Sequence, residues 1–202
     1  MTRFATFTLA GFALAVLLST GGVGTTGDHA QKAGGDGMKM AGPKKAICVI
    51  QPLTGSKDQP KVSGVVIFTQ RGDVIEITGK ITGLTPGLHG FHVHEYGDMT
   101  DDKGMSTGAH FDPDKTKHGG PDSKERHVGD LGNIKANDKG VADIDMMDKM
   151  LSLHGAHSII GRGLIVHAKA DDLKTQPSGD AGGRVGGGVI GVAKGDEEAK
   201  KH

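Results

Sequence analysis

His92-Val93-His94 opens the stretch that organises this chain, and Asp130 closes it. These 39 residues contain five histidines, His92, His94, His110, His118 and His127, and end in the carboxylate of Asp130, and a further histidine, His167, follows in an apolar run. Nitrogen ligands combined with one carboxylate favour zinc and copper over magnesium or calcium, which prefer oxygen. A single histidine is usually a surface or hydrogen-bonded structural residue, but six ligand-type side chains at this spacing predict a metal site.

The local spacing of these residues supports a metal site. In an extended segment at 90–94 successive side chains alternate between two faces, so His92 and His94 project to the same side. His127 and Asp130 form a second local pair across a glycine-containing turn. One strand and one turn therefore each supply two candidate ligands.

The composition of the 202 residues limits the class of protein. The length suits one domain with additional segments. Lysine plus arginine and aspartate plus glutamate balance at 24 each, which argues against a nucleic acid or an anionic membrane as partner. Thirty-five glycines and 3% aromatic residues favour short strands joined by turns over a helical bundle.

Strand patterns recur through the middle of the chain, and nothing between them resembles a long amphipathic helix. Turn clusters at 70–73 and 137–140 separate some of them. The pattern predicts an all-β antiparallel sandwich or barrel. The expected strands cover 46–50, 62–68, 75–82, 142–146, 164–168 and 189–193. The interval 95–132 is too long for a hairpin and holds most of the candidate ligands, so metal binding is expected to order it.

The two ends of the chain differ from this middle part. One arginine followed by an apolar run at 4–18 and small residues predicts a signal peptide at 1–22, with an uncleaved membrane tether as the alternative. We therefore expect a periplasmic or secreted protein. A flexible glycine-rich linker is expected at 23–43, where Met38, Met40 and His29 offer a possible copper-capturing group. The folded domain is expected at 44–194 and a charged flexible tail at 195–202.

Five motifs, in matching order from about Lys45 to Lys194, resemble the copper-zinc superoxide dismutase family. They are Gly-Leu-His-Gly-Phe-His-Val-His-Glu-Tyr-Gly-Asp at 87–98, the segment 118–133 ending in Arg-His-Val-Gly-Asp-Leu-Gly-Asn, Ser-Ile-Ile-Gly-Arg at 158–162, Val-His-Ala-Lys-Ala-Asp-Asp at 166–172 and Gly-Val-Ile-Gly-Val-Ala at 188–193. The resemblance implies a Greek-key antiparallel β-sandwich or flattened barrel with long metal-binding loops.

The resemblance also assigns roles to individual residues. It implies that copper is bound by His92, His94, His110 and His167, and that zinc is bound by His110, His118, His127 and Asp130. His110 then bridges both metals. Asp171 corresponds to a carboxylate that orients His92 and His118 from behind, Arg184 to the active-site arginine, and Lys169 to a cation that attracts the substrate anion. His89, His154 and His157 are not expected to bind metal.

The implied activity is superoxide dismutation, in which copper redox cycling converts two superoxide radicals into dioxygen and hydrogen peroxide while zinc structures the loop. His110 and Arg184 are the implied catalytic residues. The resemblance further implies a homodimer through residues matching Tyr96, Ile160 and Val192, with a monomer as the alternative. A non-enzymatic copper chaperone or copper-storage module on the same fold is the main competing function, and a sandwich stabilised by zinc alone is a third.

The chain departs from the family at its disulfide. The resemblance places the two cysteines at Gly104 and Gly187, and the only cysteine, Cys48, lies in the first expected strand. A cross-link that closes a loop of about 80 residues contributes on the order of 4 to 5 kcal/mol in the chain-entropy model.

Without that cross-link, metal binding must contribute more of the order in the loop, so we expect the metal-free protein to be markedly less stable than the metal-loaded protein. Differential scanning calorimetry of the two forms measures the difference. Nearly equal melting temperatures would contradict this prediction.

Overall fold

A computed structural model of the protein describes residues 42–53 and 61–195. The secondary structure of this part consists of eight strands and one short 3-10 helix. The elements are β1 (Lys45–Pro52), β2 (Ser63–Arg71), β3 (Val74–Thr82), β4 (Gly87–His94), η1 (Met105–Thr107), β5 (Asp130–Ala136), β6 (Ala142–Asp148), β7 (Gly163–His167) and β8 (Arg184–Val192).

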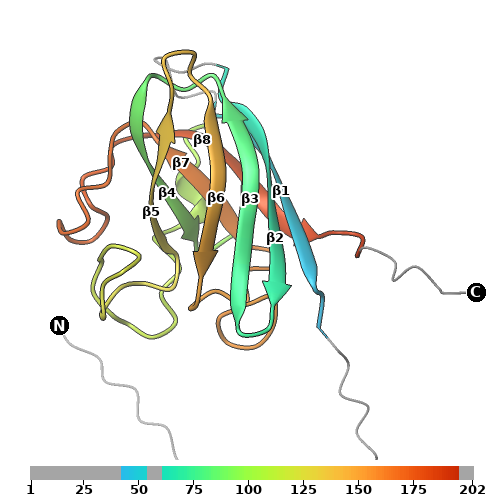
Figure 1. Ribbon diagram of the computed structural model, residues 1–202. Helices are drawn as coiled ribbons and strands as arrows, with labels where there is room; N and C mark the ends of the chain where they lie inside the picture. Colours follow the sequence, from blue (N-terminus) through green and yellow to red (C-terminus); the bar gives the residue numbers. More distant parts are fainter. Residues whose placement is uncertain (1–41, 54–60, 196–202) are drawn as a thin grey trace, which may run out of the picture. The chain divides into compact units, whose positions relative to one another are not determined.

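The strands form one antiparallel sheet in the order β5-β4-β7-β8-β1-β2-β3-β6 (Figure 1). The connections from β3 to β4 and from β6 to β7 join strands that are not neighbours, as in a Greek key. β5 and β6, at opposite ends of this order, are joined by the short turn 137–141, so the sheet curls into a nearly closed barrel. The predicted all-β fold is confirmed.

Alternation along the strands fills the barrel interior. On β3, Ile75, Ile77 and Ile81 are fully buried, whereas Glu76 and Lys80 between them point outward and are partly or fully exposed. Two aromatic rings of the core, Phe68 on β2 and Phe91 on β4, are fully buried. The interior is therefore built mainly from aliphatic and phenyl side chains, and His92 and His94 of β4 lie on the other side of their strand.

The sequence pattern missed β5, and the structure gives the reason. Between β4 and β5 the register runs from Gly90 opposite Asn133 to His92 opposite Asp130, so one extra residue lies on β5. Gly132, with a φ of 74°, forms this bulge. The bulge interrupts the alternation of apolar and polar residues that identifies a strand in a sequence.

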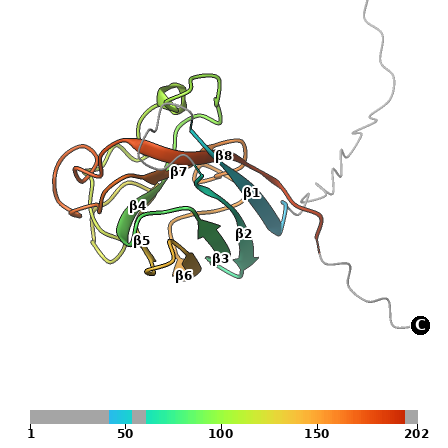
Figure 2. The same cartoon turned by 90° about the horizontal axis from the view of Figure 1, so that it is seen from above.

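Two long connections, 95–129 and 168–183, extend from the barrel on the same side, as the two views in Figures 1 and 2 show. The first carries His110, His118 and His127, the predicted metal ligands that do not lie on strands, and the second carries Asp171. No helix in the described part of the chain has the length and apolar character needed to cross a membrane. The predicted signal peptide, the methionines and histidine of the linker, and the tail beyond 195 lie outside the described residues.

β8 begins with a run of glycines that the sequence pattern also failed to identify as strand. A Cβ atom at Gly188 would lie 2.3 Å from the carbonyl oxygen of Val49 on β1. Only glycine therefore allows β8 to approach β1 so closely. At Gly191 on the same strand, the nearest heavy atom to such a Cβ, the carbonyl oxygen of Ile47, is 4.0 Å away.

We expect Gly188→Ala to lower the free energy of unfolding by about 1–3 kcal/mol, because the new methyl group forces the backbones of β8 and β1 apart. Gly191→Ala is the matched control and should change it by less than about 0.5 kcal/mol. Urea unfolding of both variants in the same metal state measures the effect. Equal stabilities of the two variants would contradict the prediction.

Candidate metal centre

Strand β4 supplies two histidines on one face. His92 and His94 alternate with Phe91 and Val93, whose side chains are fully buried in the core. The two imidazole rings therefore project away from the core, towards the long connections. Their exposed fractions are only 0% and 1%. The strand thus holds two buried ligand-type side chains on a hydrogen-bonded backbone.

The connection that follows β4 returns to the same strand. The amide of Phe111 donates a hydrogen bond to the carbonyl of Val93 at 2.8 Å, and the amide of Val93 donates to the carbonyl of Gly129 at 2.9 Å. These bonds attach two loop segments to β4, one around His110 and one that ends at Asp130. His110 and Asp130 are therefore held beside His92 on β4, although Asp130 is 38 positions away from His92 in the sequence.

The structure brings all the predicted ligands together in two sets. Within each set, one potential ligand atom per residue lies within 4.8 Å of the others. The four-histidine set contains His92, His94, His110 and His167, and the three-histidine-aspartate set contains His110, His118, His127 and Asp130. Every member is buried, and His110 belongs to both sets.

Four buried ring nitrogens in the four-histidine set have no hydrogen-bond partner in the described part of the protein. They are Nδ1 of His92, Nε2 of His94, Nε2 of His110 and Nε2 of His167. Burial of a polar atom without a partner costs about 1–3 kcal/mol. A bound metal ion would satisfy each of these nitrogens, so the donor atoms fit a metal centre.

The opposite nitrogen of each ring is fixed by the protein. Nδ1 of His94 lies 3.0 Å from the carbonyl oxygen of Gly108, and Nδ1 of His167 lies 3.1 Å from that of Gly182. A carbonyl oxygen only accepts, so these ring nitrogens carry the proton and donate. The nitrogen that faces the set then keeps its lone pair, as a metal ligand requires.

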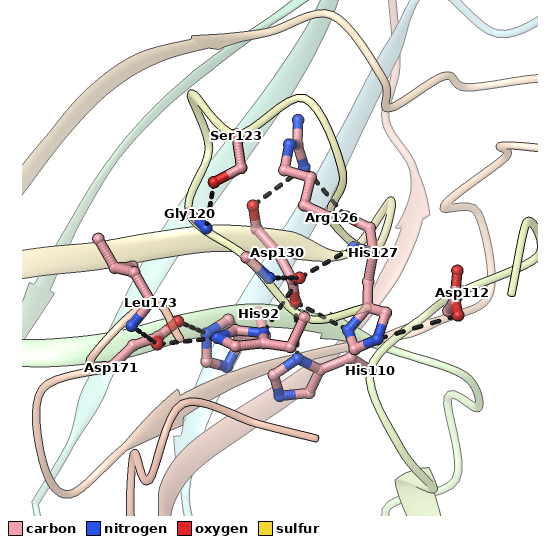
Figure 3. Close-up of polar contacts among 12 residues, drawn as sticks. His92, His110, Asp112, Gly120, Ser123, Arg126, His127, Asp130, Asp171 and Leu173 are labelled. Carbon is pink, nitrogen blue, oxygen red and sulfur yellow. Dashed lines mark hydrogen bonds and ion pairs between the residues drawn. The ribbon is translucent and has the colours of Figure 1, made fainter. Parts of the chain in front are cut away.

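The Asp130 carboxylate lies at the centre of the second set. Its Oδ1 is 2.7 Å from Nδ1 of His110 and 3.2 Å from Nδ1 of His127, and its Oδ2 is 3.0 Å from Nδ1 of His118. Figure 3 shows His110 and His127 converging on this carboxylate. Oδ2 also accepts from the amides of Gly119 and His127 at 3.0 and 2.9 Å. Asp130 therefore organises this loop as well as offering an oxygen donor.

Asp171 contacts one histidine from each donor set, at the Nε2 atom of each ring. Its Oδ2 lies 2.8 Å from Nε2 of His92 (Figure 3). Its Oδ1 lies 3.0 Å from Nε2 of His118. The amide of Leu173 also donates to Oδ1, at 2.6 Å. One buried carboxylate thus orients one ring from each set, as predicted for this residue.

Burial and hydrogen bonds shift the pKa values of these groups in different directions. Burial lowers the pKa of His110 to about 4 and lowers the pKa values of His94 and His167 well below the usual histidine range. Burial also acts to lower the pKa of His118, but hydrogen bonds with the carboxylates of Asp130 and Asp171 raise it to about 9. His94, His110 and His167 are therefore neutral at pH 7, and their lone pairs are available.

A cavity of about 650 Å³ opens next to the four-histidine set. Its walls include His94, His110, His167, Met105 and Arg184. The Arg184 guanidinium donates to the carbonyls of Gly104 and Gly108, the latter at 2.7 Å. A fixed cation therefore lines the same cavity as three of the candidate metal ligands.

Lys169 lies further out. It is exposed, and its methylene groups lie over Gly182, which lines the cavity. The Lys169 side chain is not among those that line the cavity. Its predicted role in attracting an anion therefore depends on its positive charge beside Gly182, at the cavity wall.

The remaining described histidines have structural contacts. The ring nitrogens of His89 lie 2.7 Å from the carbonyl oxygen of His167 and 2.9 Å from that of Thr85. Those of His157 lie near the Met150 carbonyl and the Asp114 carboxylate. His154 is exposed. None of the three belongs to either donor set.

Two residues that the sequence analysis did not single out support the ligands. The side chain of Asn133 donates to the backbone carbonyl of Asp171 at 2.9 Å and accepts from its amide at 2.8 Å. The side chain of Gln176 contacts the backbone of His118 in the same reciprocal way, with both distances 2.9 Å. Asn133 ends a motif quoted above, whereas nothing in the sequence around Gln176 indicates its contact, 58 residues away.

Apolar side chains lie where the family disulfide is expected. A Cβ atom at Gly104 would lie 2.8 Å from Cδ1 of Leu53, and one at Gly187 would lie 2.8 Å from Cδ1 of Ile165. Leu53 and Ile165 are both buried. Packing therefore replaces the covalent bond at these two positions. Cys48 is buried, and burial raises the pKa of its thiol to about 12, so it is an unreactive core residue.

Comparison with known proteins agrees with this arrangement. The family model described as copper/zinc superoxide dismutase (SODC) matches residues 62–190. Among solved structures, the crystal structure of the clock protein EA4 is similar to this chain, with 42% sequence identity and a TM-score of 0.68. The match covers 76% of this chain and 97% of that chain.

The pKa shifts predict a stability maximum for the metal-free protein near pH 6.5, the ordinary histidine pKa. The raised pKa of His118 contributes stability that is complete below about 6.5 and is lost as the pH rises to about 9. The lowered pKa values of His94, His110 and His167 contribute stability that is present above about 6.5 and is lost as the pH falls below it, for His110 down to about 4.

Melting temperatures measured by circular dichroism at pH 4.5, 6.5 and 9 on chelator-treated protein test this prediction. His118→Gln is the control variant, and it should flatten the alkaline side while leaving the acidic side in place. A wild-type melting temperature that rises steadily from pH 6.5 to 9 would show that the prediction is wrong.

Proposed function

The chain belongs to the copper/zinc superoxide dismutase family, and on this basis we propose that it catalyses the dismutation of superoxide. In this reaction two superoxide anions and two protons give dioxygen and hydrogen peroxide. The single observation that carries the proposal is that Arg184 lines one cavity with His94, His110 and His167, whose Nε2 atoms have no hydrogen bond. This is a cationic pocket for a small anion beside a complete nitrogen donor set.

The donor chemistry supports copper for the four-histidine set and zinc for the three-histidine-aspartate set. Imidazole ligands without an oxygen donor suit an ion that changes oxidation state, whereas four ligands including one carboxylate suit redox-inert zinc. Copper would supply one-electron redox chemistry, by accepting an electron from one superoxide and donating it to a second. Zinc in the other set would order the loop 95–129.

His110 is well placed to handle a proton. Asp130 fixes its Nδ1 at 2.7 Å, while its Nε2 faces the four-histidine set and the ring lines the cavity. The reaction consumes two protons for each peroxide formed. We assign His110 Nε2 the role of taking up one of these protons and delivering it to the departing peroxide.

Arg184 is the group that docks the anion. Burial lowers the pKa of its guanidinium and the charge of Asp101 raises it, but an arginine remains protonated at neutral pH. Hydrogen bonds to the carbonyls of Gly104 and Gly108 and to the hydroxyl of Thr107 hold the guanidinium still, and its two remaining N–H donors are available to a diatomic anion. The exposed Lys169 adds positive charge outside the cavity and would raise the rate of encounter.

The exposed apolar surface supports a homodimer. Tyr96 and Val192, at two of the predicted contact positions, have exposed fractions of 58% and 60%. Val49 on β1 and Val189 on β8, on strands that pair with each other, are also exposed. A second copy of the chain would cover these side chains. We also propose an extracytoplasmic location, on the basis of the apolar segment at 4–18.

A metal-storage or chaperone function on the same fold is the alternative, because a complete donor set also suits ion binding without turnover. Mass spectrometry for metals, combined with a superoxide-decay assay, separates the functions. Copper and zinc with accelerated decay support the enzyme. Copper without turnover supports storage, and zinc alone supports a structural role.

We expect Arg184→Gln to lower the second-order rate constant for superoxide by on the order of 10- to 100-fold, because the docking cation is lost. Copper and zinc contents should stay as in the wild type. Arg71→Gln is the control, since Arg71 is exposed and pairs with Glu76 on the neighbouring strand. An unchanged rate in Arg184→Gln would contradict the role of Arg184.

A further inference from the structure

The hydroxyl group of Thr107 lies between Arg184 and His94. Thr107 is the last residue of η1, and its exposed fraction is 0%. Its Oγ1 accepts a hydrogen bond from Nη1 of Arg184 at 2.7 Å and donates one to the carbonyl of Gly104 at 2.9 Å. Nδ1 of His94 lies 3.3 Å from the same oxygen. One buried hydroxyl therefore contacts the docking cation, a candidate metal ligand and the loop backbone.

From these contacts we infer that Thr107 is a positioning residue for Arg184. The inference rests on the docking role of Arg184 proposed above. A threonine hydroxyl has one donor hydrogen and two acceptor lone pairs. The Gly104 carbonyl uses the donor, Arg184 uses one lone pair, and the Nδ1–H of His94 points towards the other while donating to Gly108. The hydroxyl has no free orientation left, so it holds the guanidinium in one place.

The methyl group and backbone of Thr107 fix the hydroxyl in turn. A Cβ atom at Gly163 on β7 would lie 3.1 Å from the Thr107 methyl carbon, so the absence of a side chain there makes room for the methyl group. The Thr107 amide donates to the Gly104 carbonyl at 3.2 Å, and its carbonyl accepts from the amide of Tyr96 at 2.9 Å. Both ends of the residue are therefore anchored.

The same contacts connect the two places where the family has its disulfide. Gly104 corresponds to one cysteine position, and Arg184 lies on β8 three residues before the other, Gly187. Arg184 reaches back across 77 residues to Thr107 and across 80 residues to Gly104. In this chain, hydrogen bonds among Gly104, Thr107 and Arg184 therefore connect the loop 95–129 to β8. The same bonds position the guanidinium of Arg184.

Three variants of the full chain test the inference: Thr107→Val, which removes the hydroxyl at similar volume, Thr107→Ser, which keeps it, and Thr82→Val as control. Thr82 is a half-buried threonine on β3 whose hydroxyl contacts Ser63. In the copper- and zinc-loaded protein we expect Thr107→Val to lower the second-order rate constant by about 5- to 20-fold, with metal contents unchanged. Thr107→Ser and the control should stay within about twofold of the wild type.

A second readout does not depend on turnover. In protein loaded with zinc alone, which is diamagnetic, the Nη protons of Arg184 should give separate NMR signals in the wild type and in Thr107→Ser. Loss of the Thr107 hydrogen bond should speed rotation of the guanidinium and merge these signals in Thr107→Val. Thr107→Ala serves the same comparison if Thr107→Val does not fold.

Separate Arg184 signals and an unchanged rate in the hydroxyl-free variant would overturn the inference, as would a Thr107→Ser variant as impaired as Thr107→Val. If the wild-type protein does not accelerate superoxide decay, the proposed function fails. The NMR comparison still decides whether Thr107 positions Arg184, so the two failures can be distinguished.

Discussion

The candidate metal centre depends on the positions of protons: the four ring nitrogens of His92, His94, His110 and His167 that have no hydrogen-bond partner must keep their lone pairs. Each lone pair survives only if the opposite nitrogen of its ring is held by another group. Carbonyls of Gly108 and Gly182 hold His94 and His167, and the carboxylate of Asp171 holds His92 and His118. These groups come from the two long connections. The histidines are therefore oriented as metal ligands only when those connections are folded over β4.

The candidate ligands could be predicted because their chemistry is local. His92 and His94 alternate on one strand, and His127 and Asp130 share one turn, so the sequence alone shows these pairs. Strands with clear alternation, such as β3, were predicted for the same reason. β5 was missed because the bulge at Gly132 breaks its alternation, and the start of β8 was missed because glycines replace the apolar residues of a typical strand.

The supporting residues could not be predicted, because their contacts join segments that are distant in sequence. Asn133 contacts Asp171 across 38 residues, and Gln176 contacts His118 across 58 residues. Threonine, asparagine and glutamine are common in loops, so their presence gives no signal. Likewise the sequence shows that the disulfide is missing, but only the structure shows that Leu53 and Ile165 occupy the space beside Gly104 and Gly187.

Asp171 contacts one histidine of each donor set, so it would couple the binding of one metal ion to the binding of the other. An ion that binds His118 fixes the Asp171 carboxylate, which in turn fixes the ring of His92 in the other set. The shared ring of His110 transmits the same effect. Occupation of either set therefore preorganises its neighbour, and thermodynamic linkage requires the gain in affinity to be equal in both directions. If both sets bind metal ions as proposed, this preorganisation would favour cooperative loading and make half-filled molecules rarer than independent binding would give.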